Sequence, residues 1–160
     1  RRVLFRSYTA REISVSELQT HFTVFYQGKK LGRISSESLG NHNVCNTLAA
    51  VAVAMELNMD FPAVSDALKN FTGVQRRFEI LHQSDSLTIV DDYGHHPAEI
   101  QATLETAKTV WPNRRLVVVF QPHRFSRTQH LLESFYSSFN DADQLVLLDI
   151  YAAGDRKSVV

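Results

Sequence analysis

Three short apolar runs in the second half of the chain constrain its fold more than any other feature. They are LTIV at residues 87–90, LVVVF at 116–120 and LVLL at 145–148. Segments of helical length and periodicity separate them, and we predict one helix from Pro97 to about Val110 and another over 127–139. Strands that alternate with helices in this way predict an α/β fold with a parallel sheet covered by helices on both faces.

The first part of the chain follows a different pattern. Phe22, Val24 and Tyr26 alternate with polar residues before the QGKK turn, which predicts a β-hairpin. A helix is predicted just after GNHN at 40–43, with Asn43 as its N-cap, and a second helix from Pro62 to about residue 70. We read residues 71–80 as a connector and place a domain boundary near 74–77.

Bulk composition excludes several classes of protein. Seventeen Lys and Arg balance seventeen Asp and Glu, so no net charge favours nucleic acid or a membrane surface as a partner. No apolar run reaches the roughly 20 residues that a transmembrane helix needs. The single cysteine, Cys45, falls on the apolar stripe of the first predicted helix, so we expect it to be a small core residue. A lone cysteine cannot form an intramolecular disulfide, which fits a reducing cytoplasm. Residues 1–7 and 156–160 continue no neighbouring pattern and are read as boundary residues.

Polar residues follow each of the three predicted strands. The segments are DDYGHHP at 91–97, QPHRFSR at 121–127 and DIYAAGD at 149–155. Because parallel strands joined by right-handed crossovers end at one edge of a sheet, we expect these segments to line a shared cleft. The charged and titratable residues there are His95, His96, His123, Arg124 and Arg127, with Asp91 and Asp92 as their acidic counterparts.

The chemistry of this predicted cleft is that of an anion site. Arg124 and Arg127 begin a predicted helix and suit a carboxylate or phosphate held bidentately. The alternative is that these arginines pair only with Asp91 and Asp92 or with solvent. The histidine spacing matches no zinc motif, so no metal site is predicted, and His96 is expected to cap the helix that Pro97 begins.

Familiar catalytic motifs are missing from the sequence. It holds no G-x-x-x-x-G-K-[ST] loop, no G-x-G-x-x-G fingerprint and no G-x-S-x-G elbow. The residues alone therefore indicate a cleft for anions without a complete catalytic apparatus.

Five motifs, taken together and in order, resemble the Mur ligase family. They are GNHNVCNTLAAVAVAMEL, FTGVQRRFE, IVDDYGHHPAEI, VVVFQPHRFSRT and LLDIYAAGD. The resemblance implies that residues 1–75 are the end of a central ATPase domain. It also implies that residues 76–160 are a Rossmann-like carboxy-terminal domain that is cut short, with the phosphate loop upstream of this chain. Leu39 departs from the proline expected before Gly40.

The resemblance also implies roles for individual residues. Asn43 and Asn46 would bind ATP, Asp92 would help to hold its ribose, and Arg77 would approach its phosphates. His95, Arg124 and Arg127 would surround the carboxylate of the amino acid or product. Tyr93 and His123 are second-rank candidates in the same cleft.

The motifs are most similar to the branch of the family that joins L-alanine to UDP-N-acetylmuramate in peptidoglycan synthesis. The implied reaction uses ATP and Mg²⁺, passes through an acyl phosphate and takes place in the bacterial cytoplasm, and the piece alone is expected to be inactive. Three alternatives stay open. They are the sister ligase that attaches a recycled tripeptide, a stand-alone nucleotide- or anion-binding module, and a metal hydrolase that uses the histidines.

Overall fold

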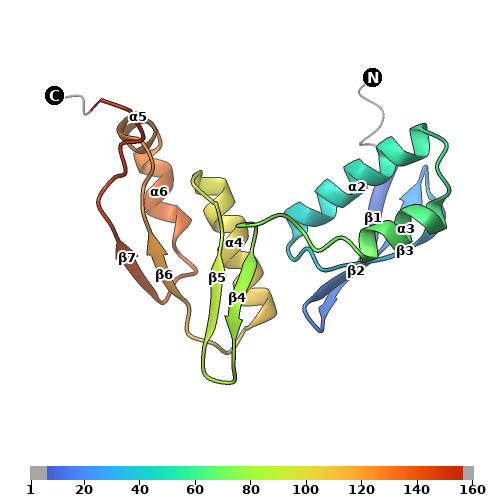
Figure 1. The fold of residues 1–160 in the computed structure, drawn as a ribbon, viewed down its shortest axis with the longest axis horizontal. Coiled ribbons are helices and arrows are strands. Elements are labelled where there is room, and N and C mark those ends of the chain that lie inside the picture. Colours follow the sequence, from blue (N-terminus) through green and yellow to red (C-terminus); the bar gives the residue numbers. More distant parts are fainter. Residues whose placement is uncertain (1–6, 157–160) are drawn as a thin grey trace. The chain divides into compact units, whose positions relative to one another are not determined.

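The computed structural model describes residues 7–156. The chain forms two compact units, Arg1–Asp91 and Asp92–Val160 (Figure 1). Of the predicted boundary residues, 1–6 and 157–160 lie outside the described part. The domain boundary near 74–77 stays a prediction. Among residues 7–156, no helix is both long and apolar enough to span a membrane.

The first unit opens with three antiparallel strands in the order β1-β2-β3. Their bounds are Tyr8–Ser16, Gln19–Tyr26 and Lys29–Ser36. The predicted hairpin is confirmed as β2 and β3, and its turn places Gln27 and Gly28 at φ 48° and 82°. Positive φ at both central residues matches the right-handed twist of the strands, which explains the glycine. The strand β1 was not predicted.

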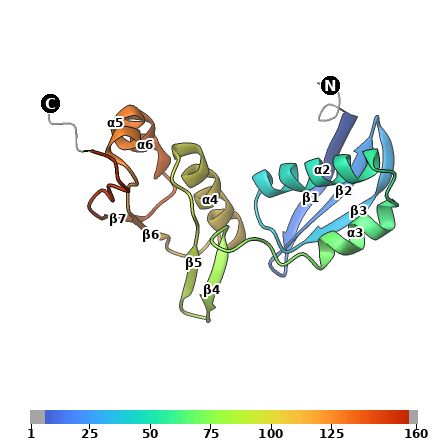
Figure 2. The same cartoon turned by 45° about the horizontal axis from the view of Figure 1, so that its top comes forward.

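Two helices pack against this sheet (Figure 2). They are α2 at Asn41–Glu56 and α3 at Phe61–Lys69, and Pro62 lies in the first turn of α3 as expected. The most deeply buried apolar side chains of this core are Phe22, Val24, Ile34 and Val51. Their close packing holds the helices on the sheet.

Two details of α2 differ from the predictions. Gly40 is the N-cap, and Asn43 lies inside the first turn, because the helix begins three residues earlier than expected. Cys45 is exposed. The buried stripe runs through Val44, Thr47 and Val51, and residue 45 is rotated by about 100° from residue 44, which turns it outward.

The predicted connector contains a strand. Residues Glu79–Gln83 form β4, which pairs antiparallel with β5 at Thr88–Asp91. The run at 87–90 is therefore a strand, but within the described residues its partner is β4 rather than a parallel neighbour. A short loop brings β4 and β5 together at little entropic cost, whereas a parallel pair needs a long crossover.

The second unit contains the predicted strand–helix–strand pattern. Its elements are α4 at Pro97–Val110, β6 at Val117–Phe120, α5 at Phe125–His130, α6 at Leu132–Ser138 and β7 at Gln144–Leu147. Strands β6 and β7 are parallel, with Val117 opposite Gln144 and Phe120 opposite Leu147. The α/β class is confirmed, and the core consists of Ile100, Leu104, Phe120 and Phe135.

The helix predicted over 127–139 is two helices. Leu131, at φ −108° and ψ 13°, ends α5 and begins α6. The segment contains neither Gly nor Pro, so its composition does not reveal the break. Leu131 packs against the core of this unit, as Phe139 does.

Candidate functional site

The segments that follow β6 and β7 lie side by side. His123 and Tyr151 form a parallel bridge, and their rings are 5.3 Å apart. The backbone N–H of Arg124 donates to the Tyr151 carbonyl at 2.8 Å, and the Tyr151 N–H donates to the Pro122 carbonyl at 2.8 Å. The parallel pairing therefore continues beyond the strands and brings together two of the three predicted polar segments.

The two candidate arginines follow the bridge residue His123 in the chain and lie at the start of α5. Arg124 is exposed and adopts φ 74°, a conformation that a non-glycine residue rarely takes. Arg127 is half-buried, and its Nη1 donates to the His123 carbonyl at 3.5 Å. The Asp91 carboxylate accepts from Arg76 Nε at 3.1 Å, and the alternative in which Asp91 and Asp92 pair with the two candidate arginines stays open. Arg76 is thus in an ion pair.

Sequence reasoning missed Asp155. Its Oδ2 accepts from the backbone N–H of Ser126 at 2.8 Å, at the start of α5. Hydrogen bonds from the Ser126 hydroxyl and then from its N–H hold the pKa of Asp155 below the ordinary carboxyl range, and Arg124 adds to the effect. The available sequence signal was Gly154, a residue that favours turns. In the structure Ala153 and Gly154 both have positive φ and fold the chain back after β7.

A compact turn connects Asp92 to α4. Asp92 Oδ1 accepts from the Gly94 N–H at 2.7 Å. A Cβ at Gly94 would lie 2.8 Å from the same oxygen, so a larger residue there would have to displace the Asp92 carboxylate, whereas φ at Gly94 is not unusual. The turn places His95 and His96 directly before the helix.

The start of α4 is a complete capping box. His96 is the N-cap, as predicted, and its Nδ1 accepts from the Ala98 N–H at 3.3 Å. The Glu99 carboxylate accepts from the N–H groups of His95 and His96, both at 3.1 Å. This arrangement satisfies backbone donors that a helix start leaves unpaired.

The side chain of His95 is held on one edge. Its Nδ1 lies 3.2 Å from the Tyr93 carbonyl and 3.5 Å from Glu99 Oε2. The Tyr93 ring meets the imidazole edge-on, with centroids 5.1 Å apart. The side chains of His95 and Tyr93 are therefore in contact with each other.

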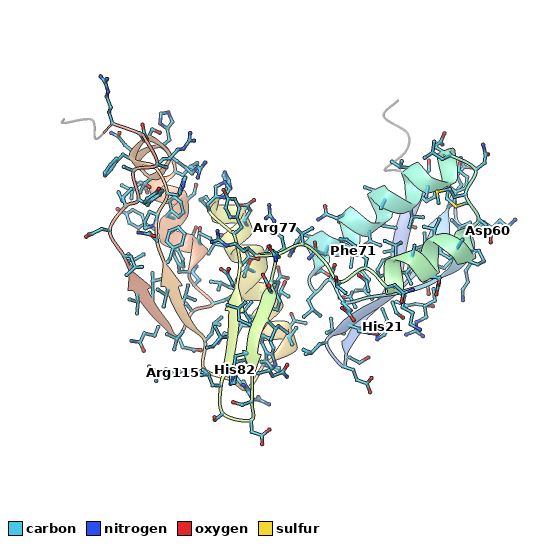
Figure 3. All side chains as sticks on the ribbon, in the orientation of Figure 1. His21, Asp60, Phe71, Arg77, His82 and Arg115 are labelled. Atoms are coloured by element: carbon cyan, nitrogen blue, oxygen red, sulfur yellow. The ribbon has the colours of Figure 1, made fainter. Side chains whose placement is uncertain are left out.

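The residues predicted to bind ATP through α2 lie in the first unit. Asn43 Nδ2 donates to the Leu39 carbonyl at 2.8 Å, and the exposed Asn46 donates to Asn43 Oδ1 at 3.2 Å. Arg77 is exposed on the segment that leads into β4 (Figure 3). Arg77 and Leu39 both line a pocket of about 520 Å³ in this unit. Asn43 therefore bonds to the backbone of a pocket-lining residue.

Within the second unit, α4 and α5 begin at the end where β6 and β7 finish (Figures 1 and 2). Asp92, Tyr93 and His95 precede α4, whereas His123, Arg124 and Arg127 surround the start of α5. That these six residues share one cleft stays a prediction. Residues 7–156 hold no group of three or more His, Cys, Asp or Glu side chains arranged for a metal ion.

Comparison with known proteins gives consistent matches. Residues 76–158 match the glutamate ligase domain of Mur ligases. UDP-N-acetylmuramate–L-alanine ligases from Syntrophotalea carbinolica and Endomicrobium trichonymphae are 55% and 48% identical, over 92% of this chain and 32% and 33% of their own lengths. The chain thus spans about a third of these relatives.

Solved structures agree with the sequence matches. The UDP-N-acetylmuramate–alanine ligase MurC from Thermotoga maritima matches with a TM-score of 0.80 and 35% identity, over 91% of this chain and 32% of its own. MurF from Acinetobacter baumannii, at 19% identity over 90% of this chain and 36% of its own, has a TM-score of 0.68 and shares the fold. The chain therefore belongs to the Mur ligase family.

Proposed function

We propose that the chain is part of an ATP-dependent ligase that joins L-alanine to UDP-N-acetylmuramate through an acyl phosphate, in bacterial peptidoglycan synthesis. The observation that carries the proposal is the pair of arginines that follows β6 beside the end of β7. Relatives with that named activity are up to 55% identical among the matches described above. Both substrates and the product carry carboxylates, for which paired guanidinium groups are well suited.

The reaction makes two physical demands on these residues. An amine must be placed against an acyl carbon, and negative charge on transferring phosphoryl oxygens must be neutralised. We assign Arg124, Arg127 and His95 to the amino-acid or product carboxylate. Tyr93 and His123 are second-rank groups there. None of these residues is assigned as a nucleophile, because the proposed chemistry depends on positioning and charge.

ATP is assigned to another set of residues. Asn43 and Asn46 carry amides, which donate and accept at once and therefore suit a purine edge. We assign Asp92 to the ribose and Arg77 to the phosphates, where a permanent cation is useful. Since the chain covers 32% of a matched relative, the ligands of Mg²⁺ are proposed to lie in the remainder of a longer protein. No nucleic acid or membrane partner is proposed, and the proposed location is the cytoplasm.

The division of roles is tested by steady-state kinetics of the longer ligase that carries this chain. Arg127→Ala should raise KM for L-alanine by about 10- to 100-fold, because a charge-assisted carboxylate contact is lost. Asn46→Ala should raise KM for ATP instead. Arg33→Ala, which removes an exposed arginine from β3, is the matched control. The 160-residue chain alone serves as the inactive control.

Two results would contradict the proposal. If Arg127→Ala and Asn46→Ala both changed only the use of ATP, the assignment of the carboxylate site would be wrong. If the longer protein accepted a tripeptide and not L-alanine, the sister ligase would replace the proposed activity.

A further inference from the structure

We propose that Glu99 is a positioning residue that fixes the imidazole of His95, so that only its Nε2 edge is presented to the amino-acid substrate. This inference deepens the proposed function and rests on it, because it takes His95 to be a substrate contact. Glu99 lies within the motif IVDDYGHHPAEI, and its role so far is to cap α4. Its contacts with His95 distinguish it from an ordinary capping residue.

The contacts of Nδ1 determine which ring nitrogen carries hydrogen. Its two neighbours are the Tyr93 carbonyl at 3.2 Å and the Glu99 carboxylate at 3.5 Å. A carbonyl and an ionised carboxylate only accept hydrogen bonds, so Nδ1 must be a donor. In the neutral ring this places the lone pair on Nε2. In the imidazolium both nitrogens donate, and Nδ1 remains directed at the protein.

Glu99 is itself held in place. Its Oε2 accepts from the backbone N–H groups of both His95 and His96 at 3.1 Å. These two hydrogen bonds keep the Glu99 carboxylate in place. The edge-on Tyr93 ring restricts rotation of the imidazole. Backbone and side chain of His95 are thus anchored to one carboxylate.

The pair also remains accessible. The side chains of His95 and Glu99 are 29% and 35% exposed, and residues 7–156 provide no hydrogen bond to Nε2. Because Nδ1 faces Tyr93 and Glu99, we take the exposed part of the imidazole to include the Nε2 edge. An imidazolium that donates from Nε2 to the substrate carboxylate would have its charge balanced by Glu99 on the opposite edge.

The first test measures the ring directly. Nitrogen-15 NMR of the 160-residue chain should show neutral His95 as the Nδ1–H tautomer. Glu99→Ala should shift His95 toward a mixture of tautomers, whereas His96→Ala should not. A wild-type spectrum with the hydrogen of neutral His95 on Nε2 would overturn the inference.

The second test separates positioning from helix capping. In the longer ligase, Glu99→Ala should raise KM for L-alanine about 10-fold and leave KM for ATP unchanged, since an oriented charged contact is lost. Glu99→Gln keeps an oxygen for the capping box and should have a smaller effect. His96→Ala removes the N-cap acceptor without removing the partner of His95, and it should leave KM for L-alanine unchanged.

The outcomes separate the two levels of the proposal. An equal increase in KM for L-alanine in His96→Ala and Glu99→Ala would mean that Glu99 only caps the helix. If the wild-type ligase uses L-alanine and Glu99→Ala leaves KM for L-alanine unchanged, the inference is rejected but the proposed function is not. A wild-type protein that does not use L-alanine would reject the proposed function, and with it the kinetic role of Glu99.

Discussion

At the scale of single residues, the glycines at positions 32 and 94 are explained by atoms packed close to them rather than by an unusual backbone φ. Gly32 lies in β3, and a Cβ there would overlap the Phe61 ring, which is buried at the start of α3. Gly94 shows the same principle against the Asp92 carboxylate. A missing side chain in each case lets another group pack directly against the backbone.

We expect Gly32→Ala to destabilise the chain by about 1–3 kcal/mol, because the Phe61 ring is confined and overpacking displaces it. Chemical denaturation measures this change. Phe61→Leu on the Gly32→Ala background should recover part of the loss, since the smaller side chain vacates the space. If the changes in unfolding free energy for Gly32→Ala and Phe61→Leu were simply additive, the contact between residue 32 and the Phe61 ring would not limit the packing.

At the scale of elements, one carboxylate joins three segments of the second unit. Asp143 precedes β7, and its Oδ2 accepts from Lys108 Nζ of α4 at 2.9 Å and from the Leu116 N–H before β6 at 2.6 Å. The Leu116 N–H contributes most to holding the pKa of Asp143 below the ordinary carboxyl value, and Lys108 follows. The ends of α4, β6 and β7 therefore share an acid-sensitive connection.

The stability of this connection should depend on pH. A carboxyl whose pKa is lowered by folding stabilises the native state above its unfolded pKa of about 4, and this contribution is lost as the pH falls through the lower native value. Asp143→Asn should therefore lower the melting temperature at pH 7, and the difference from wild type should shrink below about pH 4.

The control for that measurement is Asp141→Asn, which removes an exposed carboxylate two residues away. It should leave both the melting temperature and its acid dependence close to wild type. A difference between Asp143→Asn and wild type that stayed constant from pH 7 to pH 3 would contradict the linkage.

At the scale of the whole molecule, residues 7–156 contain two hydrophobic cores. The first unit buries Phe22, Val24 and Ile34 under α2 and α3. In the second unit the Phe120 ring lies 5.7 Å from Phe135 and 5.2 Å from Phe139. Each core contains residues from helices and strands of its own unit, so each is a cooperative element that can be tested by itself.

Phe120→Ala should destabilise the second unit by about 3–5 kcal/mol, because it removes a buried ring and leaves a cavity between β6 and α6. Hydrogen exchange should show lower protection of the α4 and β6 amides. Tyr136→Ala, which removes an exposed aromatic side chain from α6, is the control. Unchanged protection in Phe120→Ala would mean that the ring does not organise this core.

The local pattern determined much of this protein. Periodicity predicted α4 with its buried Ile100, Leu104 and Ala107, and Pro62 and His96 marked helix starts correctly, because these signals act over a few neighbouring residues. The residue types Arg124, Arg127 and His95 predicted an anion site, and that site stays a prediction. The family resemblance was also legible from the sequence, and the comparisons confirm it.

Tertiary structure decided what depends on distant partners. Strand pairing joined β5 to β4, the bridge between His123 and Tyr151 set the backbone of Arg124, and the turn after β7 brought Asp155 to Ser126. The contacts of Arg124 and Asp155 join segments that are far apart in the chain, so local spacing does not encode them. The β4–β5 hairpin is local, but which strand pairs with β5 depends on which segments compete for its backbone hydrogen bonds. Composition and periodicity therefore define the elements and their chemistry, and pairing between them defines which side chains meet.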